Sequence, residues 1–459
     1  MKFRIGLLMQ ALPIAALACI LVMWFAAPAQ AVPAFTRETN MSCNQCHTAH
    51  GGPIPNFTMT GKKFRSLGYR IPESREVMES GVPGQKGEYL KLPILPYLSF
   101  RLQSTLASVS KSPVTGKWGE TSTNPTTRFA IFWVGPIGDH LGVWNEFYLT
   151  TLGSRDEEWG LDLGSWDEWD LRWTFNPNNP SWHVDMGITN MPITDLHGFG
   201  PFPVFAGGGK IQRGEINGWA HPNYATAFFS GWMFDRWIWL LGANTGDNNV
   251  GWDYSNFVGE FGYAVLNTNA DELWLHAWGR TGNDVMPLVT QNFVEDRGRD
   301  WSYRDAVSGI TATRPAGAGP YLSRNVHQAN TAEGEIRWSR QDWGPHSFEA
   351  VARYGWSKDE YEDGAKTDNS TAGLDILYGW KHTYYAMPFV NKNTTYDFTD
   401  HTGKKHSIDN SPSYGCNFAY KPTENVLLNL QVLTTQVLHV DQKPDDKGVA
   451  LSFYVDLLL

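Results

Sequence analysis

The sequence predicts a mainly β fold, a transmembrane antiparallel β-barrel of about 16 strands, behind a small N-terminal α-helical segment. Aromatic residues make up 14% of the chain, whereas charged residues make up only 18% against a usual share of about 25%. The mean hydropathy is nevertheless negative. From residue 95 onward, apolar and polar residues alternate with a period of two. A barrel with an apolar outer wall, a polar lumen and aromatic girdles combines these properties.

Charged residues share one face of several alternating segments. In one of them, Trp169, Leu171, Trp173 and Phe175 alternate with Glu168, Asp170, Arg172 and Thr174. Such charges are costly in the packed core of a soluble sandwich and natural in a wet lumen. The opposite orientation, with the charges outside, would describe a soluble sandwich. The Trp excess, the number of segments and the alternating C-terminal segment 451–457 favour the barrel.

The connections between these segments differ in length. Tight turns are predicted at 136–138 and 235–236, and long connections at 190–222, 281–332 and 392–411. Short turns at one end and long loops at the other are typical of outer-membrane barrels. No run inside residues 90–459, the predicted barrel domain, reaches the length of a spanning helix.

Residues 1–31 predict a secretory signal peptide. Lys2 and Arg4 precede an apolar run over 5–27, and Ala29-Gln30-Ala31 is a small-residue cleavage site. The alternative is an uncleaved membrane anchor. Cleavage after Ala31 removes two positive charges, so the formal net charge goes from −10 to −12. That acidic balance argues against nucleic acid as a partner.

The segment 32–75 contains the motif C-x-x-C-H at Cys43, Cys46 and His47. Two thiols at this spacing reach the two vinyl groups of a haem, and the adjacent imidazole reaches its iron. The motif predicts one covalently bound haem c as cofactor. A zinc site would need a fourth ligand, and a redox disulfide would need a thioredoxin-like context; the sequence offers neither. Cys416 is left over with no assigned role.

The distal ligand of the haem iron stays open. Met59 lies twelve residues after His47, far enough to fold back over the ring, and His50 lies close by. Met41 is a third option, and an open or remote ligand a fourth. A Met ligand would raise the reduction potential.

A short helix is expected after the motif. Phe57, Thr60, Gly61, Phe64 and Leu67 recur at helical spacing, with Asn56 placed to cap the start and Gly68 to end the helix. Lys62, Lys63 and Arg65 fall on the other side of it. They would either pair with haem propionates or be solvated. The segment 32–75 is too short to bury a haem by itself.

The alternating segments contain no catalytic motif of a hydrolase, nucleotide-binding enzyme or zinc protease. Acidic residues gather near one hairpin, and they would either attract a divalent cation or form a solvated loop. They are Asp156, Glu157, Glu158, Asp162, Asp167 and Glu168.

A monohaem segment followed directly by a β-barrel resembles the fused cytochrome–porins of iron oxidisers, the outer-membrane iron oxidase family called Cyc-two. The similar residues are Pro33-Ala34-Phe35-Thr36-Arg37, Cys43-Asn44-Gln45-Cys46-His47-Thr48, Gly61-Lys62-Lys63-Phe64-Arg65 and Gly68-Tyr69. The rest of the chain is similar in architecture and size only.

The resemblance implies an iron-oxidising oxidoreductase embedded in outer-membrane lipid. Extracellular Fe(II) would be the electron donor and a periplasmic c-type cytochrome the acceptor. Two alternatives remain at this point: a haem-tagged porin that moves solutes, and a soluble periplasmic c-type oxidoreductase.

Overall fold

The structure is a computed structural model of the chain. The residues that it describes are 35, 46–47, 57–70, 98–111, 118, 127–152, 165–191, 196–199, 226–244, 256–268, 271–282, 301–304, 310–314, 326–361, 366–381, 383–399, 403–407, 412–423, 426–439 and 447–458. The predicted signal peptide 1–31 lies outside them, as do Met41, Cys43 and His50.

One helix and nineteen strands are defined among these residues. The helix and the first ten strands are α4 (Met59–Ser66), β1 (Leu98–Lys111), β2 (Thr127–Ile137), β3 (Leu141–Leu152), β4 (Ser165–Thr174), β5 (Trp182–Thr189), β6 (Thr226–Met233), β7 (Trp237–Asn244), β8 (Asn256–Asn267), β9 (Asp271–Gly282) and β10 (Trp301–Arg304). The others are β11 (Ile310–Arg314), β12 (Val326–Trp343), β13 (His346–Tyr361), β14 (Lys366–Trp380), β15 (Tyr384–Thr399), β16 (Lys405–Ser407), β17 (Ser413–Thr423), β18 (Val426–His439) and β19 (Lys447–Leu458).

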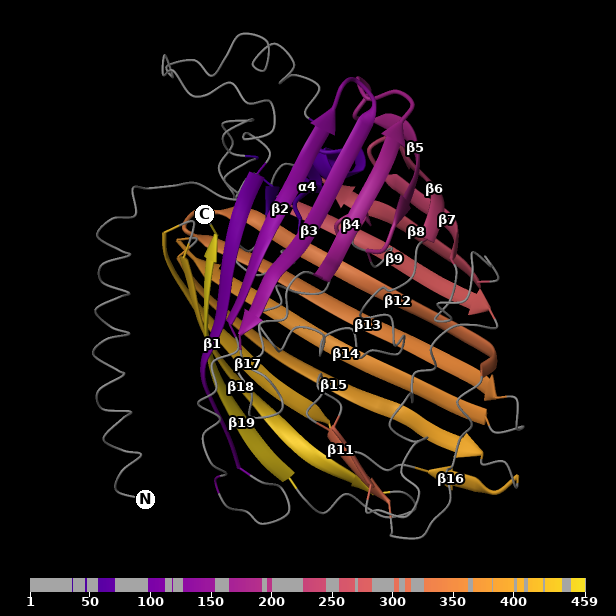
Figure 1. Cartoon of the computed structure of the whole chain (residues 1–459), viewed down its shortest axis with the longest axis vertical. Helices are drawn as coiled ribbons and strands as arrows, with labels where there is room; N and C mark the ends of the chain where they lie inside the picture. The colour runs from indigo at the N-terminus through magenta and orange to yellow at the C-terminus, as the bar shows by residue number, and fades with distance from the viewer. Residues whose placement is uncertain are drawn as a thin grey trace.

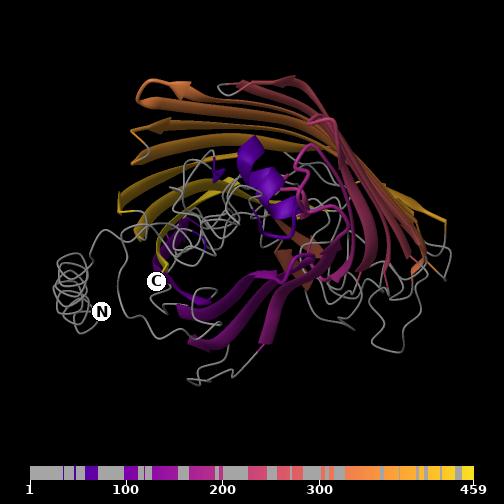
Figure 2. The same ribbon diagram turned by 90° about the horizontal axis from the view of Figure 1, so that it is seen from above.

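The strands form one sheet that closes on itself (Figures 1 and 2). Strand β1 pairs antiparallel with both β2 and β19, β9 pairs with β12, and β15 pairs with β17. Three of the 19 strands are additions to the ring: β10 and β11 form a hairpin that joins β18 in parallel, and β16 extends β15. The remaining 16 strands make a closed antiparallel barrel, which confirms the predicted barrel of about 16 strands.

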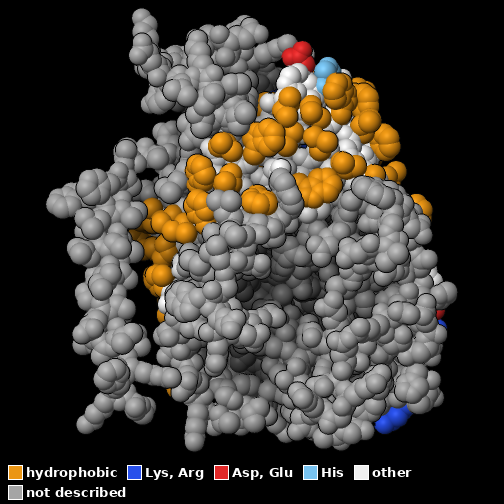
Figure 3. All heavy atoms as spheres, in the orientation of Figure 1, with side chains coloured by type: hydrophobic (Ala, Val, Ile, Leu, Met, Phe, Trp, Pro, Cys, Tyr) orange, Lys and Arg blue, Asp and Glu red, His pale blue; other side chains and the backbone are white. Residues whose placement is uncertain are grey.

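The side chains alternate across the barrel wall as the period of two predicts. Arg101, Asp170 and Arg172 point inward and are at most 2% exposed. On the outer side, Leu241 is 65% and Phe257 is 59% exposed. Figure 3 shows apolar side chains gathered over the described strands of one face. A wall with buried charges inside and exposed apolar groups outside excludes the soluble sandwich.

The short turns lie together at one end of the barrel, which we call the short-turn end. They connect β2 to β3, β4 to β5, β6 to β7, β8 to β9, β12 to β13, β14 to β15 and β17 to β18. The start of β1 and the end of β19 lie there too, because Arg101 pairs with Leu458. Large exposed aromatic residues flank these turns: Phe175, Trp182, Phe234, Trp237, Trp343, Trp380, Tyr384 and Tyr420. Such a girdle marks a membrane interface, and short turns face the periplasm in outer-membrane barrels.

The predicted connection at 392–411 is partly wrong. Strand β15 continues to Thr399 and pairs with β16 at Lys405–Ser407. The reason is the sequence Thr394-Thr395-Tyr396-Asp397-Phe398-Thr399, which is rich in β-branched and aromatic residues. The predicted connection 281–332 likewise contains β10 and β11, and it loses its last residues to β12.

The helix α4 begins later than the sequence predicts. Thr58, not Asn56, caps it, and the Thr58 hydroxyl accepts a hydrogen bond from the Gly61 amide. Phe57 cannot join the helix because it forms a β-bridge with His47. Gly68 ends the helix as predicted, with a positive φ of 66°. No helix in the described ranges is long and apolar enough to cross a membrane.

Candidate functional site in the barrel lumen

Helix α4 lies inside the barrel (Figure 2), and its contacts place it toward the short-turn end. Lys63 forms an ion pair with Asp235 in the β6–β7 turn. Arg70 donates to the carbonyl of Gly138 in the β2–β3 turn at 3.1 Å. These contacts fix the segment that follows the predicted haem motif to two separate short turns of the wall.

The strongest tie between helix and wall is Glu272 on β9. Its carboxylate accepts a hydrogen bond from the Met59 amide at 2.6 Å and pairs with the Lys62 ammonium at 3.0 Å. Lys62 is 1% exposed and also donates to the Phe57 carbonyl at 2.7 Å. A buried ammonium needs such partners, because desolvation of an unpaired charge is costly.

The alternative that Lys62 and Arg65 are solvated is wrong, whereas pairing with haem propionates stays a prediction. Both side chains are buried, at 1% and 4% exposure. The helix sits in a lumen whose wall carries charges, so a charged face can be covered as readily as an apolar one. Helical spacing alone does not predict the burial of Lys62 and Arg65, because that prediction takes the covered face of a helix to be its apolar face.

A second set of contacts joins the end of the helical segment to β4. The Tyr69 hydroxyl donates to Asp170 at 3.0 Å, and Arg172 donates to the same carboxylate at 2.8 Å. Arg172 also donates to the Arg65 carbonyl at 3.0 Å. Burial and the neighbouring Asp170 charge raise the pKa of Tyr69 far above its ordinary value, so this hydroxyl stays protonated and donates.

Cys46 and His47 rest directly on this helix. The Thr58 amide donates to the Cys46 carbonyl at 2.9 Å, and the His47 ring lies 4.8 Å from the Phe57 ring, centroid to centroid. A Cβ at Gly61 would come within 2.1 Å of the Cys46 oxygen, so the helix must have glycine there. Burial raises the pKa of the Cys46 thiol to about 11, which keeps it protonated.

The described part of the donor set fits a c-type haem. A thiol that is not in a disulfide and the imidazole beside it have the chemistry that covalent attachment and iron ligation require. Cys43 and His50 lie outside the described residues. Met59 does not point to bulk solvent: it packs against an apolar cluster of Phe199, Trp232, Ile238, Ala264 and Trp274. Its role as distal ligand stays a prediction.

A short inward segment, residues 196–199 between β5 and β6, covers the same region from the lumen. Leu196, His197 and Phe199 are fully buried. Gly198 has a φ of 74°, and a Cβ there would lie 2.9 Å from the Phe57 ring. The sequence predicts only a long connection at this place, because a few apolar residues in a Gly- and Pro-rich loop give no periodic signal.

His197 begins a chain of charged and imidazole groups on the inner wall. Its Nδ1 lies 2.7 Å from Glu260, whose other oxygen lies 2.8 Å from His276 Nε2. His276 Nδ1 is 3.3 Å from Glu335, which pairs with Arg337. Phe199 stacks on the His276 ring at 4.4 Å. These contacts fix the inward segment to β8, β9 and β12. The sequence does not predict them, because the residues involved lie far apart along the polypeptide.

Cys416 and the acidic cluster are the two other features that the sequence singles out. Cys416 on β17 is not in a disulfide, and no group of three or more His, Cys, Asp or Glu able to hold a metal occurs among the described residues. Asp156, Glu157, Glu158 and Asp162 fall outside those residues, so the acidic cluster stays a prediction.

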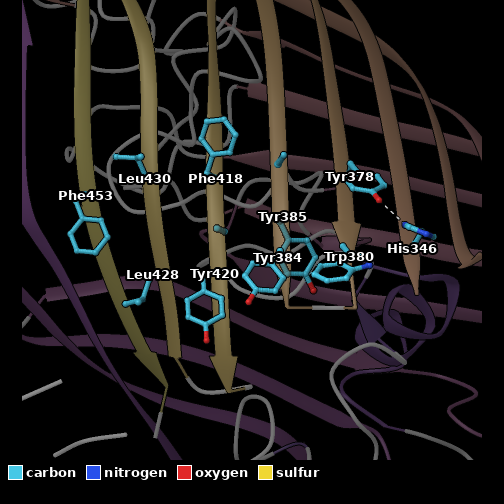
Figure 4. Close-up of a pocket in the computed structure, with 12 residues that line it drawn as sticks. His346, Tyr378, Trp380, Tyr384, Tyr385, Phe418, Tyr420, Leu428, Leu430 and Phe453 are labelled. Atoms are coloured by element: carbon cyan, nitrogen blue, oxygen red, sulfur yellow. Dashed lines mark hydrogen bonds between the residues drawn. The ribbon is translucent and has the colours of Figure 1, made fainter. Parts of the chain in front are cut away.

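A separate cavity of about 690 Å³ lies beside the aromatic girdle on β13–β19 (Figure 4). Its walls include Trp380, Tyr384 and Tyr420, and the Tyr384 ring stacks on both others at 5.5 and 5.1 Å. These three side chains are exposed on the outer wall. The cavity therefore belongs to the membrane interface and not to the lumen.

No family model and no curated protein matches the chain. Among solved structures, OmpT of Vibrio cholerae in its trimer form is 9% identical with a TM-score of 0.46, over 79% of this chain and 98% of that one. The anion-selective porin from Comamonas acidovorans is 9% identical with a TM-score of 0.41, over 79% and 98% of the two chains.

The closed ring, the apolar outer wall, the polar lumen and the aromatic girdle at the short turns define the class. The protein is a porin-like β-barrel of the bacterial outer membrane, in contact with membrane lipid. Its lumen holds the helix that follows the C-x-x-C-H motif.

Replacing Glu272 with Gln should loosen α4. The change removes the only charge that compensates buried Lys62 in the described structure, and breaking a buried pair costs about 3–5 kcal/mol. Hydrogen exchange of the α4 amides should speed up accordingly. The matched control is Asp271→Asn on the same strand, whose partner Arg340 is 43% exposed at 3.8 Å, a pair worth about 0–1 kcal/mol. Equal protection in both variants would contradict the account.

The contact between Lys63 and Asp235 should depend on pH. Burial alone would raise the pKa of Asp235, but the hydrogen bonds from Lys63 and Ser181 and the Lys63 charge outweigh it and lower that pKa. The stabilisation is thus present above the ordinary Asp pKa and is lost as the pH falls through the folded value. The α4 amides of wild type should exchange more slowly than those of Asp235→Asn at pH 7, and the difference should vanish well below about pH 4. A difference in exchange between wild type and Asp235→Asn that persists in acid would contradict the stabilising role of the Lys63–Asp235 pair.

Proposed function

We propose that the protein is an outer-membrane cytochrome–porin that carries one haem c on Cys43 and Cys46, with His47 as an iron ligand, and conducts electrons across the membrane. The observation that supports this most is the docking of Cys46 and His47 on α4, within the lumen of a closed barrel. A motif that binds an electron carrier and a wall that spans the bilayer thus belong to one chain.

The position of α4 suggests the direction of transfer. The bilayer core is about 25–30 Å thick, too far for direct electron transfer between soluble donors and acceptors on its two sides. The helix lies at the short-turn end, which faces the periplasm in barrels of this class. A carrier held there is within reach of a periplasmic c-type cytochrome, the acceptor that we propose.

The chain supplies the binding and the shelter. Cys43 and Cys46 would hold the haem as thioethers, and His47 would bind its iron. The Phe57 ring packs against the His47 ring, and the buried inward segment 196–199 covers Phe57. When bound, the haem supplies an iron centre that accepts and releases one electron.

Extracellular Fe(II) is the electron donor that we propose, which makes the protein an iron-oxidising oxidoreductase. The ion would act as a substrate: it gives up one electron and leaves as Fe(III). The full chain carries a formal net charge of −10, and an acidic protein raises the local concentration of cations. The resemblance to the cytochrome–porins of iron oxidisers supports the same donor.

A haem-tagged solute porin is the second candidate. It is favoured by the 16-stranded ring with its polar inner wall, an architecture that passes solutes in porins. The third alternative, a soluble periplasmic oxidoreductase, does not agree with the apolar outer wall and is dropped.

Ferrous iron should reduce the haem of the purified protein. Protein matured in a host that attaches c-type haem should carry one covalent haem, and Fe(II) added in detergent should bring out the reduced absorption bands. Cys43→Ser/Cys46→Ser should lack the covalent haem, whereas Cys416→Ser should keep it and respond like wild type. Covalent haem that chemical reductants reduce and Fe(II) does not would favour the solute porin. The absence of covalent haem would overturn the proposal altogether.

A further inference from the structure

Helix α4 carries three cationic side chains, and the described part of the barrel wall provides a carboxylate partner for only two of them. Lys62 pairs with Glu272 and Lys63 pairs with Asp235. Arg65 forms no ion pair with any carboxylate in the described residues, although it is 4% exposed. A buried guanidinium without a counter-ion is costly, and proteins rarely keep one without a partner.

Among the described residues, the hydrogen-bond contacts of Arg65 include no anionic group. Its Nη2 donates to the Met191 sulfur at 3.3 Å, a weak acceptor, and its Nε is buried without a hydrogen-bond partner. Asp170, the carboxylate that binds the end of the helical segment through Tyr69, also accepts from Arg172. Arg172 itself donates to the Arg65 backbone carbonyl, so this contact brings a cation and no carboxylate to Arg65.

Arg65 also lies one aromatic ring away from the haem motif. Its guanidinium carbon is 5.5 Å from the centre of the Phe57 ring, and that ring is 4.8 Å from the His47 ring. The Trp144 ring, 5.4 Å from the same carbon, forms another wall. The guanidinium is therefore held by aromatic groups beside the residue that would bind the iron.

We propose that Arg65 binds a carboxylate of the haem, one of its propionates, and serves as its counter-ion in the lumen. The inference rests on the proposed function and deepens it. A guanidinium offers its donors as a planar fork that matches a carboxylate, and the free Nε is one of those donors. A haem bound at the neighbouring His47 carries propionates as its only anionic groups. Of the three cationic residues on α4, only Arg65 has no carboxylate partner in the described residues and is therefore available to the propionates.

The charge at Arg65 should tune the reduction potential. A positive charge that neutralises a propionate favours the reduced iron, since reduction adds negative charge in a low-dielectric site. Arg65→Met should therefore lower the midpoint potential of the haem. Arg65→Lys, which restores the charge without the fork, should bring the potential back toward the wild-type value.

The experiment is a redox titration of the purified, haem-loaded full chain followed by its absorption bands. The matched control is Arg340→Met, which removes one positive charge from β12 at a side chain that is 43% exposed and 3.8 Å from Asp271, outside the contacts that fix α4. It should leave the potential within error of wild type. Heat-modifiable gel migration checks that each barrel is folded, and the haem-to-protein ratio checks loading.

The outcomes separate the two proposals. A lower potential in Arg65→Met, with Arg340→Met unchanged and Arg65→Lys restored, supports the counter-ion. If Arg65→Met folds but loses its haem while Arg65→Lys keeps it, a cation is needed at this place, and the inference is supported as well. A loaded Arg65→Met with the wild-type potential overturns this inference alone. A wild-type chain that never carries covalent haem overturns the proposed function together with it.

Discussion

Every other feature of this protein depends on the side on which its strands place their charges. A wall in contact with lipid must expose apolar groups, so alternation with a period of two sends each polar partner into the lumen. Arg101, Asp170, Glu272 and Glu335 are buried there as a result. Buried charges need partners, and the lumen is thereby suited to receive a charged helix that would otherwise stay in water.

Helix α4 places three cationic side chains, Lys62, Lys63 and Arg65, against the charged interior of the barrel. Lys62 forms an ion pair with Glu272 of β9, and Lys63 forms one with Asp235 in the β6–β7 turn. The Nε of Arg65 is buried without a hydrogen-bond partner. The segment 196–199 closes over Phe57 from the other side and is tied to the wall through His197 and Glu260. The short motif-bearing segment, which cannot shelter a cofactor alone, thus shares the interior of a much larger structure.

The sequence predicts those parts of the structure that have a local period. The strands around Phe100, Trp173 and Ile188 follow from alternation, and Gly68 ends the helix as its place after the last apolar residue suggests. Long-range pairing has no such signal. Burial of Lys62, the chain from His197 to Glu335 and the choice of Thr58 as cap depend on residues far away in sequence or on a β-bridge. The C-x-x-C-H motif remains a prediction from chemistry, since Cys43 lies outside the described residues.

The central claim is that a haem in the lumen carries electrons through the wall, and it is tested most directly in sealed vesicles. The full chain would be reconstituted with a c-type cytochrome trapped inside and Fe(II) added outside. We predict reduction of the trapped cytochrome with the haem-loaded protein and none with Cys43→Ser/Cys46→Ser. Equal reduction with both proteins would mean that iron itself passes through an open pore. Neither that result nor an unreduced cytochrome with the loaded protein is compatible with the account.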